Sequence, residues 1–269
     1  MKVVLFCGGQ GLRIRDAEPT IPKPMVAIGN RPVLWHIMRY YAHYGHKDFI
    51  LCLGYNAAAI KEFFLNYNEA LANDFVLSGD GGVELLRSDI ADWRITFLET
   101  GIQSSVGERL RAARPYLEDE EAFLASYGDT LTDAPLPDVV ETLRAGGKTA
   151  GFLCVRPTSY TFHLVTLTDG NLVDGIEAVT NSAIRINGGY FFFRREIFDY
   201  IGENEDLIEE PFARLIERRE LVAYPYDGFW APLDTLKDKH NLEALHESGR
   251  PPWAVWNHVQ YESPDVRPA

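Results

Sequence analysis

The chain has 269 residues, 46% of them hydrophobic and 24% charged, which is enough apolar material for a sizeable core and argues against a disordered protein. Its formal net charge of −13 argues against a surface that binds a nucleic-acid polymer, because a phosphate backbone has to be met by clustered Lys and Arg side chains. A nucleotide substrate is compatible with this charge, since a few cations in one cleft can bind a triphosphate and magnesium can bridge it to carboxylates.

The amino terminus and the cysteines bear on where the protein works. The first apolar run is too short for a signal sequence, and no stretch reaches the roughly 18 apolar residues that a membrane span needs. We therefore expect a cytoplasmic protein without a membrane partner. Cys7, Cys52 and Cys154 lie far apart in apolar runs and form no CxxC pair, so we expect all three to be reduced and buried.

Strand-like and helix-like segments alternate through the first half of the chain. Helices are predicted at Pro32–Tyr44, which ends at Gly45, and after Asn56, a candidate N-cap. Apolar runs around them are predicted as strands: Lys2–Phe6, Asp48–Leu53, Arg94–Glu99, Ala122–Tyr127 and Ala150–Val155. This alternation predicts an α/β fold, with a Rossmann-like, mostly parallel sheet covered by helices on both faces and a ligand cleft at the carboxyl ends of the strands.

The pattern changes after about Arg156. Three further strand-like runs indicate a smaller β-rich lobe: His163–Leu167, Leu172–Ile176 and Gly189–Phe193. Helical patterns return at Glu209–Glu217 and Thr235–Glu247, which predicts that the chain comes back to the core after the lobe.

This pattern divides the chain into three parts. We expect a core over residues 1–155, a lobe with a return to the core over residues 156–247, and an extended, proline-rich tail over residues 248–269. Residues 69–93 fit the alternation poorly, and we interpret them as an insertion used for oligomer contacts.

A glycine-rich segment directly follows the first predicted strand. Gly8, Gly9 and Gly11 allow successive backbone N–H groups to turn toward one anion, and Arg13 and Lys23 add full positive charges. The glycines alone are typical of a tight turn between strand and helix, with the cations in solvent. The combination of glycines and cations favours a phosphate-binding site, although it matches neither a Walker loop nor GxGxxG.

Two aspartates are candidates for a metal site. Asp129 directly follows the predicted strand Ala122–Tyr127, at the edge where the cleft is expected, and Asp234 precedes a predicted helix. An N-cap is the alternative role for Asp234, whereas two carboxylates on one magnesium ion would explain how an acidic protein holds a triphosphate. The histidines show no metal-ligand spacing, and His36, on an apolar predicted helix, is interpreted as packed rather than ligating.

Seven short segments follow one another in a distinctive order: Gly8 to Arg13, Lys23 to Val26, Leu34 to Met38, Thr100-Gly101, Tyr127 to Asp129, Ile186 to Gly189 and Asp234-Thr235. In this order and spacing, from Met1 to about Trp256, they resemble the sugar-1-phosphate nucleotidyltransferases, and most closely the glucose-1-phosphate cytidylyltransferases. The resemblance implies the nucleotide-diphospho-sugar transferase type of fold. It also implies a homo-oligomer.

The resemblance assigns roles to four groups of residues. Asp129 and Asp234 are expected to hold Mg²⁺, and Arg13 and Lys23 to act on the triphosphate. The expected nucleotide-binding residues are Gly8, Gly9, Gly11, Thr100, Gly101, Arg109 and Gly128. The expected acceptor-binding residues are Asn187, Gly188 and Glu209.

The implied reaction is an in-line attack of an acceptor phosphate oxygen on the α-phosphorus of a nucleoside triphosphate. The resemblance indicates CTP as the donor and a sugar 1-phosphate as the acceptor, with release of pyrophosphate and no covalent enzyme intermediate. Catalysis then consists of positioning the substrates and neutralising their charge.

Three positions depart from the family pattern. Leu12 stands where the family usually has Thr, and Ala178-Val179 stands where it has Lys-Pro, the lysine of which grips the acceptor phosphate. Thr161 stands in place of a glycine. The first change leaves the reaction type intact, whereas the other two leave the identity of the acceptor open.

Arg185 is the only cationic residue between Gly175 and Phe193 and is a candidate to replace the missing lysine. It lies two residues before Asn187, and residues i and i+2 of an extended segment point to the same face. We therefore include Arg185 among the expected acceptor-binding residues. The alternative is an arginine that faces solvent.

Three functions stay open at this point. The first is synthesis of a nucleotide sugar from CTP and a sugar 1-phosphate. The second is the same reaction with a cyclitol or another small phosphate as acceptor, or with another triphosphate. The third is a catalytically weak regulatory subunit that binds a nucleotide, which the presence of Arg13, Lys23, Asp129 and Asp234 disfavours.

Overall fold

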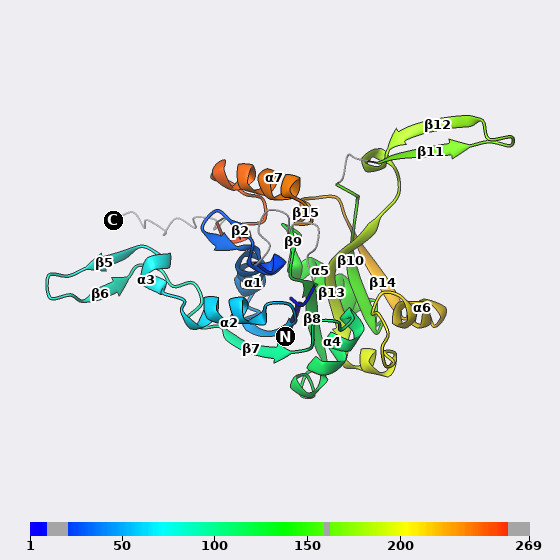
Figure 1. Cartoon of the computed structure of the whole chain (residues 1–269). Coiled ribbons are helices and arrows are strands. Elements are labelled where there is room, and N and C mark those ends of the chain that lie inside the picture. The colour runs from blue at the N-terminus through cyan, green and yellow to red at the C-terminus, as the bar shows by residue number, and fades with distance from the viewer. Residues whose placement is uncertain (10–20, 159–161, 258–269) are drawn as a thin grey trace, which may run out of the picture.

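The computed structural model describes residues 1–9, 21–158 and 162–257, and it is built around a seven-stranded sheet (Figure 1). The strand order is β14-β10-β13-β8-β1-β4-β7. Six of these strands run parallel, and β13 runs antiparallel to its neighbours β8 and β10. Their bounds are β1 Val3–Phe6, β4 Asp48–Leu53, β7 Arg94–Glu99, β8 Ala122–Tyr127, β10 Ala150–Val155, β13 Ile186–Arg194 and β14 Leu221–Tyr226. The predicted α/β fold with a mostly parallel sheet is confirmed.

Helices cover both faces of this sheet, and alternate strand residues point into two separate cores. Val3 and Leu5 of β1 pack on one side, whereas Val4 and Phe6 pack on the other. The first core includes α1 (Val33–His43), α2 (Ala57–Leu65), α5 (Leu136–Ala145) and α7 (Leu236–Glu247). The second includes α4 (Val106–Ala113) and α6 (Glu210–Glu217).

Helix α1 shows how local sequence sets an element. Pro32 precedes its first residue with the fixed φ that suits a helix start, and the buried side chains of the helix face the first core. The helix ends at His43, and Gly45, two residues later, has a φ of +86° and donates its backbone N–H to Ala42 O at 3.0 Å. His36 lies buried on this helix and is packed, as predicted.

Short segments complete the molecule. Two small sheets pair β2 (Ala27–Ile28) with β3 (Arg31–Pro32) and β9 (Thr130–Thr132) with β15 (Trp230–Pro232). The 3₁₀ segments are η1 Lys23–Met25, η2 Arg114–Tyr116, η3 Val179–Asn181, η4 Arg195–Asp199 and η5 Val255–Asn257. No helix in the described part of the chain is long and apolar enough to cross a membrane.

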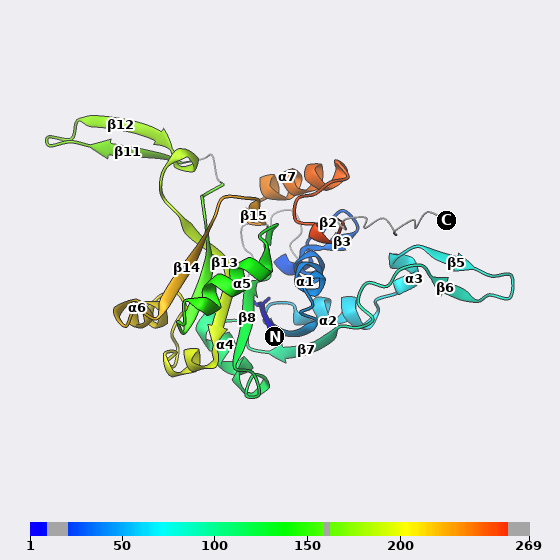
Figure 2. The same cartoon turned by 180° about the vertical axis from the view of Figure 1, so that it is seen from behind.

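Two β-hairpins project from opposite sides of the body (Figures 1 and 2). One joins β5 (Phe75–Leu77) and β6 (Val83–Leu85), and the other joins β11 (His163–Leu167) and β12 (Val173–Ala178). The prediction that Gly189–Phe193 belongs with β11 and β12 in a separate lobe is wrong, because this run lies inside the central sheet as part of β13. Its four consecutive buried aromatic residues suit a strand that is covered on both faces.

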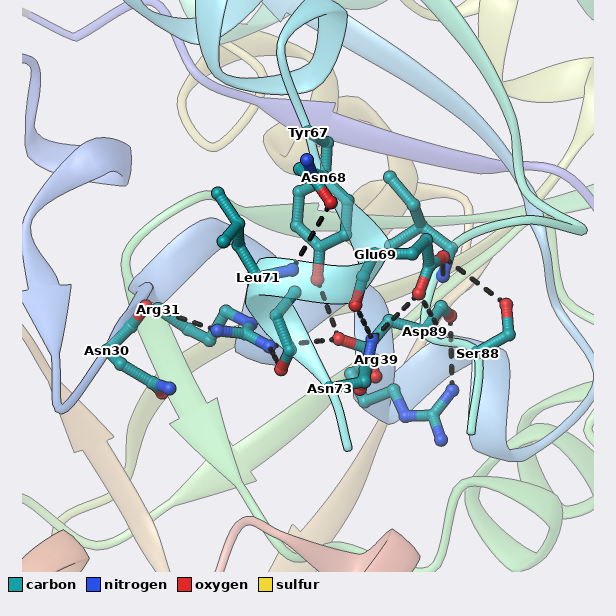
Figure 3. A network of polar contacts seen from close by, with 12 residues as sticks. Asn30, Arg31, Arg39, Tyr67, Asn68, Glu69, Leu71, Asn73, Ser88 and Asp89 are labelled. Carbon is teal, nitrogen blue, oxygen red and sulfur yellow. Dashed lines mark hydrogen bonds and ion pairs between the residues drawn. The ribbon is translucent and has the colours of Figure 1, made fainter. Parts of the chain in front are cut away.

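The base of the first hairpin is tied to the body by a polar network (Figure 3). Glu69, in the short helix α3 (Glu69–Ala72), accepts hydrogen bonds from the backbone N–H groups of Asp89 and Ile90, both at 2.9 Å. The Asp89 carboxylate in turn accepts from Arg31 at 3.1 Å and from the Tyr67 hydroxyl at 2.6 Å. This network anchors the segment 69–93, which the hydrophobic pattern alone left unassigned.

All three cysteines are free thiols, as expected. Cys7 and Cys52 are buried, whereas Cys154 is only half-buried, so the expectation of complete burial is wrong for Cys154. Cys154 lies where the pairing of β10 with β13 shifts register, near the end of β10 and the start of β13.

Candidate active site

A cavity of about 380 Å³ lies at the carboxyl ends of the central strands. Gly8 and Gly9 enter it from the end of β1, and Tyr127, Gly128 and Asp129 enter it from the end of β8. The two strands pair in parallel, with Phe6 opposite Tyr127, so the segments that follow them must lie side by side. Lys23, the loop before α4, Arg109 and Asp206 complete the wall.

Arg109 supports the floor of this cavity from beneath. Its guanidinium donates hydrogen bonds to Leu53 O and Gly8 O, each at 3.1 Å, and to Thr100 Oγ1 at 2.5 Å. It thereby joins the ends of β1, β4 and β7. A Cβ atom at Gly8 would lie 1.9 Å from a guanidinium nitrogen, so any larger residue there would displace Arg109 from these hydrogen bonds.

The Arg109 charge is buried without a carboxylate partner among the residues that the structure describes. Its acceptors there are carbonyl and hydroxyl oxygens, and burial lowers the pKa of the guanidinium. An arginine nevertheless stays protonated at neutral pH. A positive charge under a polar cavity favours an anionic ligand.

Lys23 lies between Asp129 and Asp234. Its Nζ atom is 2.6 Å from Asp129 Oδ2, and it also contacts Asp234 Oδ1. Burial on its own would lower the pKa of Lys23, but the charges and hydrogen bonds of the two aspartates outweigh burial and raise this pKa above its ordinary value. The ammonium is therefore held in its charged form.

The two aspartates come from distant parts of the sequence and meet through the small sheet of β9 and β15. Pro232 pairs with Thr130, and Leu233 N donates to Asp129 O at 2.8 Å. The N-cap of α7 is Thr235, the side chain of which accepts from Asp238 N. Asp234 is therefore free of the capping role that the sequence left open as an alternative.

This arrangement fits magnesium. Carboxylate oxygens are the ligands that Mg²⁺ prefers, and two carboxylates converge here on one cationic group. The described residues contain no group of three or more His, Cys, Asp and Glu side chains that could hold a metal. A metal held by these two aspartates needs further oxygen ligands, such as phosphate oxygens and water.

Comparison with known proteins identifies the family. No family model matches the chain. Glucose-1-phosphate cytidylyltransferase of Salmonella typhimurium is 36% identical over 257 residues, which cover 95% of this chain and 100% of that protein. A Bacillus subtilis protein named "Probable glucose-1-phosphate cytidylyltransferase" is also 36% identical, over 258 residues that cover 95% of this chain and 100% of that one. The chain belongs to the glucose-1-phosphate cytidylyltransferase family.

Members of this family are nucleotidyltransferases, and so is this chain. Among solved structures, HddC from Yersinia pseudotuberculosis in complex with GMP-PN superposes with a TM-score of 0.66 at 18% identity. The superposition covers 90% of this chain and 98% of that one. At this level of identity it shows a shared fold, and it agrees with the fold that the family resemblance implied.

Most of the expected site residues that the structure describes lie in or beside the cavity. Gly8, Gly9, Lys23, Arg109, Gly128 and Asp129 line it, and Asp234 contacts Lys23. Thr100 lies behind the wall, where it contacts Arg109, and Gly101 follows it with a φ of +95°. Gly11 and Arg13 lie outside the described residues, as do Leu12 and Thr161.

Of the expected acceptor-binding residues, two lie next to the cavity and two lie away from its lining. Asn187 Nδ2 donates to the hydroxyl of Tyr127 at 3.3 Å, which places it next to a residue of the cavity wall, and Gly188 follows it in β13. Glu209 is exposed at the start of α6 and does not line the cavity. Arg185 makes two hydrogen bonds to Asp227, at 2.9 and 3.1 Å, and is also outside the cavity lining.

Sequence reasoning missed Asp206. This carboxylate lines the cavity near Tyr127, in the loop before α6. Ser105, the N-cap of α4, holds the loop to that helix, since its hydroxyl donates to Glu205 O at 2.6 Å. An ion pair between Arg214 of α6 and Glu205 ties the same loop to α6. No local pattern marks Asp206, since its position depends on contacts with residues about 100 positions earlier in the chain.

Proposed function

We propose that the protein transfers CMP from CTP to the phosphate of a sugar 1-phosphate, which produces a CDP-sugar and pyrophosphate. The geometry that carries this proposal is one cavity in which Lys23 and Asp129 lie beside the glycine turn after β1 and Arg109, with Asp234 in contact with Lys23. The names of the relatives support CTP and glucose 1-phosphate as substrates. They are 36% identical over their whole length, which makes the same reaction class the natural inference.

In this reaction the chain mainly positions and neutralises the two substrates. The backbone N–H groups near Gly8 and Gly9, together with Lys23 and Arg13, are proposed to hold the phosphates of CTP. Arg109 adds positive charge from beneath. Asp129 and Asp234 are proposed to hold Mg²⁺, which when bound neutralises charge on the phosphate oxygens.

Asn187, Tyr127 and Asp206 are proposed to border the acceptor. A carboxylate such as Asp206 repels phosphate, so its partner there should be a neutral donor, and the hydroxyl groups of a sugar fit that requirement. Asp206 keeps acceptor capacity for such a hydroxyl, because one of its carboxylate oxygens accepts from Ile208 N at 3.1 Å and the other accepts no hydrogen bond from the part of the chain that the structure describes. This arrangement favours an acceptor that carries both a phosphate and hydroxyl groups.

A related proposal keeps the reaction and changes the acceptor to another small phosphate, such as a cyclitol phosphate. Ala178 and Val179 stand where the family carries Lys-Pro, and Arg185, the candidate replacement, is engaged with Asp227. The usual cation for the acceptor phosphate is therefore missing from this segment.

Magnesium-dependent release of pyrophosphate tests both proposals. The assay combines CTP, UTP, dTTP, GTP and ATP with glucose 1-phosphate, other sugar 1-phosphates and a cyclitol phosphate. We expect the highest kcat/KM with CTP and a sugar 1-phosphate. A higher kcat/KM with another triphosphate would overturn the choice of base, and no release from any pair would overturn the reaction.

We further propose that the protein is a homo-oligomer. The two projecting hairpins expose apolar side chains: Val76, Leu77, Val83, Val165, Leu167, Leu172, Val173 and Ile176 are each at least 46% exposed. Apolar hairpins that stand away from the body typically pack against another chain.

A further inference from the structure

Asp129 and Asp234, the proposed magnesium ligands, share a cation that belongs to the chain itself. Lys23 Nζ contacts one carboxylate oxygen of each aspartate. Its side chain is 15% exposed, whereas those of Asp129 and Asp234 are 25% and 42% exposed. The ammonium therefore occupies the point on which both carboxylates converge, which is also where a metal bound by both of them has to lie.

The carboxylates are the fixed partners in this triad, and the lysine is the movable one. Asp129 and Asp234 sit at the ends of paired strands, and Asp234 N also donates to Asp238 Oδ2 at 3.1 Å. Lys23 instead reaches them through a flexible four-carbon stem from η1. Its ammonium can leave the aspartates by side-chain rotation, without a change in the backbone.

Movement of the Lys23 ammonium away from the two aspartates is unfavourable unless another anion is present. The cavity into which Lys23 would move already contains the buried charge of Arg109, which has no carboxylate partner among the described residues. Two like charges in one partly buried cavity repel each other. A bound triphosphate removes this obstacle, because its oxygens offer new partners to both cations.

We propose that Lys23 is an exchangeable cation that neutralises Asp129 and Asp234 in the substrate-free protein and moves to the phosphates when metal and triphosphate bind together. This inference rests on the proposed function. It has one main consequence: the free protein binds a divalent metal weakly at these aspartates, because Lys23 competes for the same oxygens. Metal and triphosphate then have to enter together.

Mn²⁺ binding to the nucleotide-free protein tests the exchange, measured from the electron paramagnetic resonance signal of free Mn²⁺. Lys23→Met removes the charge and keeps most of the stem, so we expect it to bind Mn²⁺ about ten-fold more tightly than the unmodified protein. Lys47→Met is the matched control, because Lys47 pairs with Asp92 on the exposed surface, and it should leave Mn²⁺ affinity unchanged. Adding Asp129→Asn and Asp234→Asn to Lys23→Met should abolish the gain.

The results separate this inference from the proposed function. Equal Mn²⁺ affinity in the unmodified protein and in folded Lys23→Met overturns the exchange. If Lys23→Met does not fold, Lys23→Gln, which keeps a hydrogen-bond donor for Asp129, is measured in the same way with the same two outcomes. Loss of the aspartates without any loss of Mn²⁺ binding in the presence of CTP overturns the metal site itself, and with it the proposed function.

Discussion

Asp129 and Asp234 reach one point from two strand ends, and each contributes charge rather than core volume. Asp129→Asn and Asp234→Asn should therefore leave the fold intact and lower kcat/KM by roughly 10²- to 10⁴-fold, since loss of metal stabilisation costs several kcal/mol of barrier. Steady-state pyrophosphate release measures the loss, and circular dichroism checks the fold. Near-normal rates in both variants at ordinary Mg²⁺ concentrations would refute the metal site.

Asp206 lines the cavity, and tertiary contacts set its position. We therefore expect a substitution of Asp206 to change the binding of the acceptor. Asp206→Asn keeps the size of the side chain and weakens its capacity to accept hydroxyl hydrogen bonds. We expect the KM for the sugar 1-phosphate to rise about ten-fold while the KM for CTP changes little. Asp199→Asn is the control, because Asp199 is an exposed carboxylate at the end of η4. A larger change in the KM for CTP would place Asp206 at the nucleotide instead.

Among the elements, the β5–β6 hairpin depends on Glu69. The carboxylate accepts from the backbone N–H groups of Asp89 and Ile90 and from Ser88, and these bonds close the base of the hairpin (Figure 3). Glu69→Ala leaves those N–H groups without their partner, which should cost about 1–3 kcal/mol of unfolding free energy.

Chemical denaturation measures this cost, and hydrogen exchange should show faster exchange in residues 75–85. Glu84→Ala is the matched control, since Glu84 is exposed on β6 of the same hairpin. Unchanged exchange in Glu69→Ala would mean that the hairpin is held by other contacts.

At the scale of the whole molecule, the two hairpins extend from opposite sides of the body (Figures 1 and 2). If both dock on further copies of the chain, a charge placed on an exposed apolar position should weaken assembly. Ile176→Asp and Leu77→Asp are expected to shift the mass measured by light scattering toward the monomer, because each buries a carboxylate in an apolar contact. Leu65→Asp, an exposed position at the end of α2, is the control. An unmodified protein that is monomeric would refute the homo-oligomer.

The stability of the whole fold should depend on pH through His36. Trp253 Nε1 can only donate, so His36 Nδ1 accepts at 3.3 Å, and His36 Nε2 donates to Ile28 O at 3.1 Å. Burial lowers the pKa of His36 from 6.5 to about 4. Below pH 6.5 His36 is protonated in the unfolded chain but stays neutral in the folded chain. The free energy of unfolding therefore decreases as the pH falls from 6.5 toward 4.

We expect this loss to amount to up to about 3 kcal/mol. His36→Asn removes the titrating group, so its unfolding free energy should fall less steeply over the same pH range, even if it is lower at pH 7. Denaturant unfolding at a series of pH values provides the measurement, with His240→Asn on the exposed surface as the control. Identical slopes for His36→Asn and the unmodified protein would contradict the assignment.

The local sequence determined most strands of the central sheet, several of the helices and the motifs at strand ends, but it did not show β14. The bounds of β4, β7, β8 and β10 coincide with the apolar runs, and Asp129 lies at the strand end where it was expected. These features depend on the periodicity and turn chemistry of neighbouring residues, which the sequence displays directly.

Tertiary structure alone decided where distant segments meet. It placed Gly189–Phe193 in the central sheet, brought Asp206 into the cavity and engaged Arg185 with Asp227. It also set Lys23 between two aspartates that lie 105 residues apart in the sequence, at positions 129 and 234. Such contacts arise from the order of the strands and from packing between elements. The residues that neighbour each contact in the sequence do not reveal the strand order or the packing.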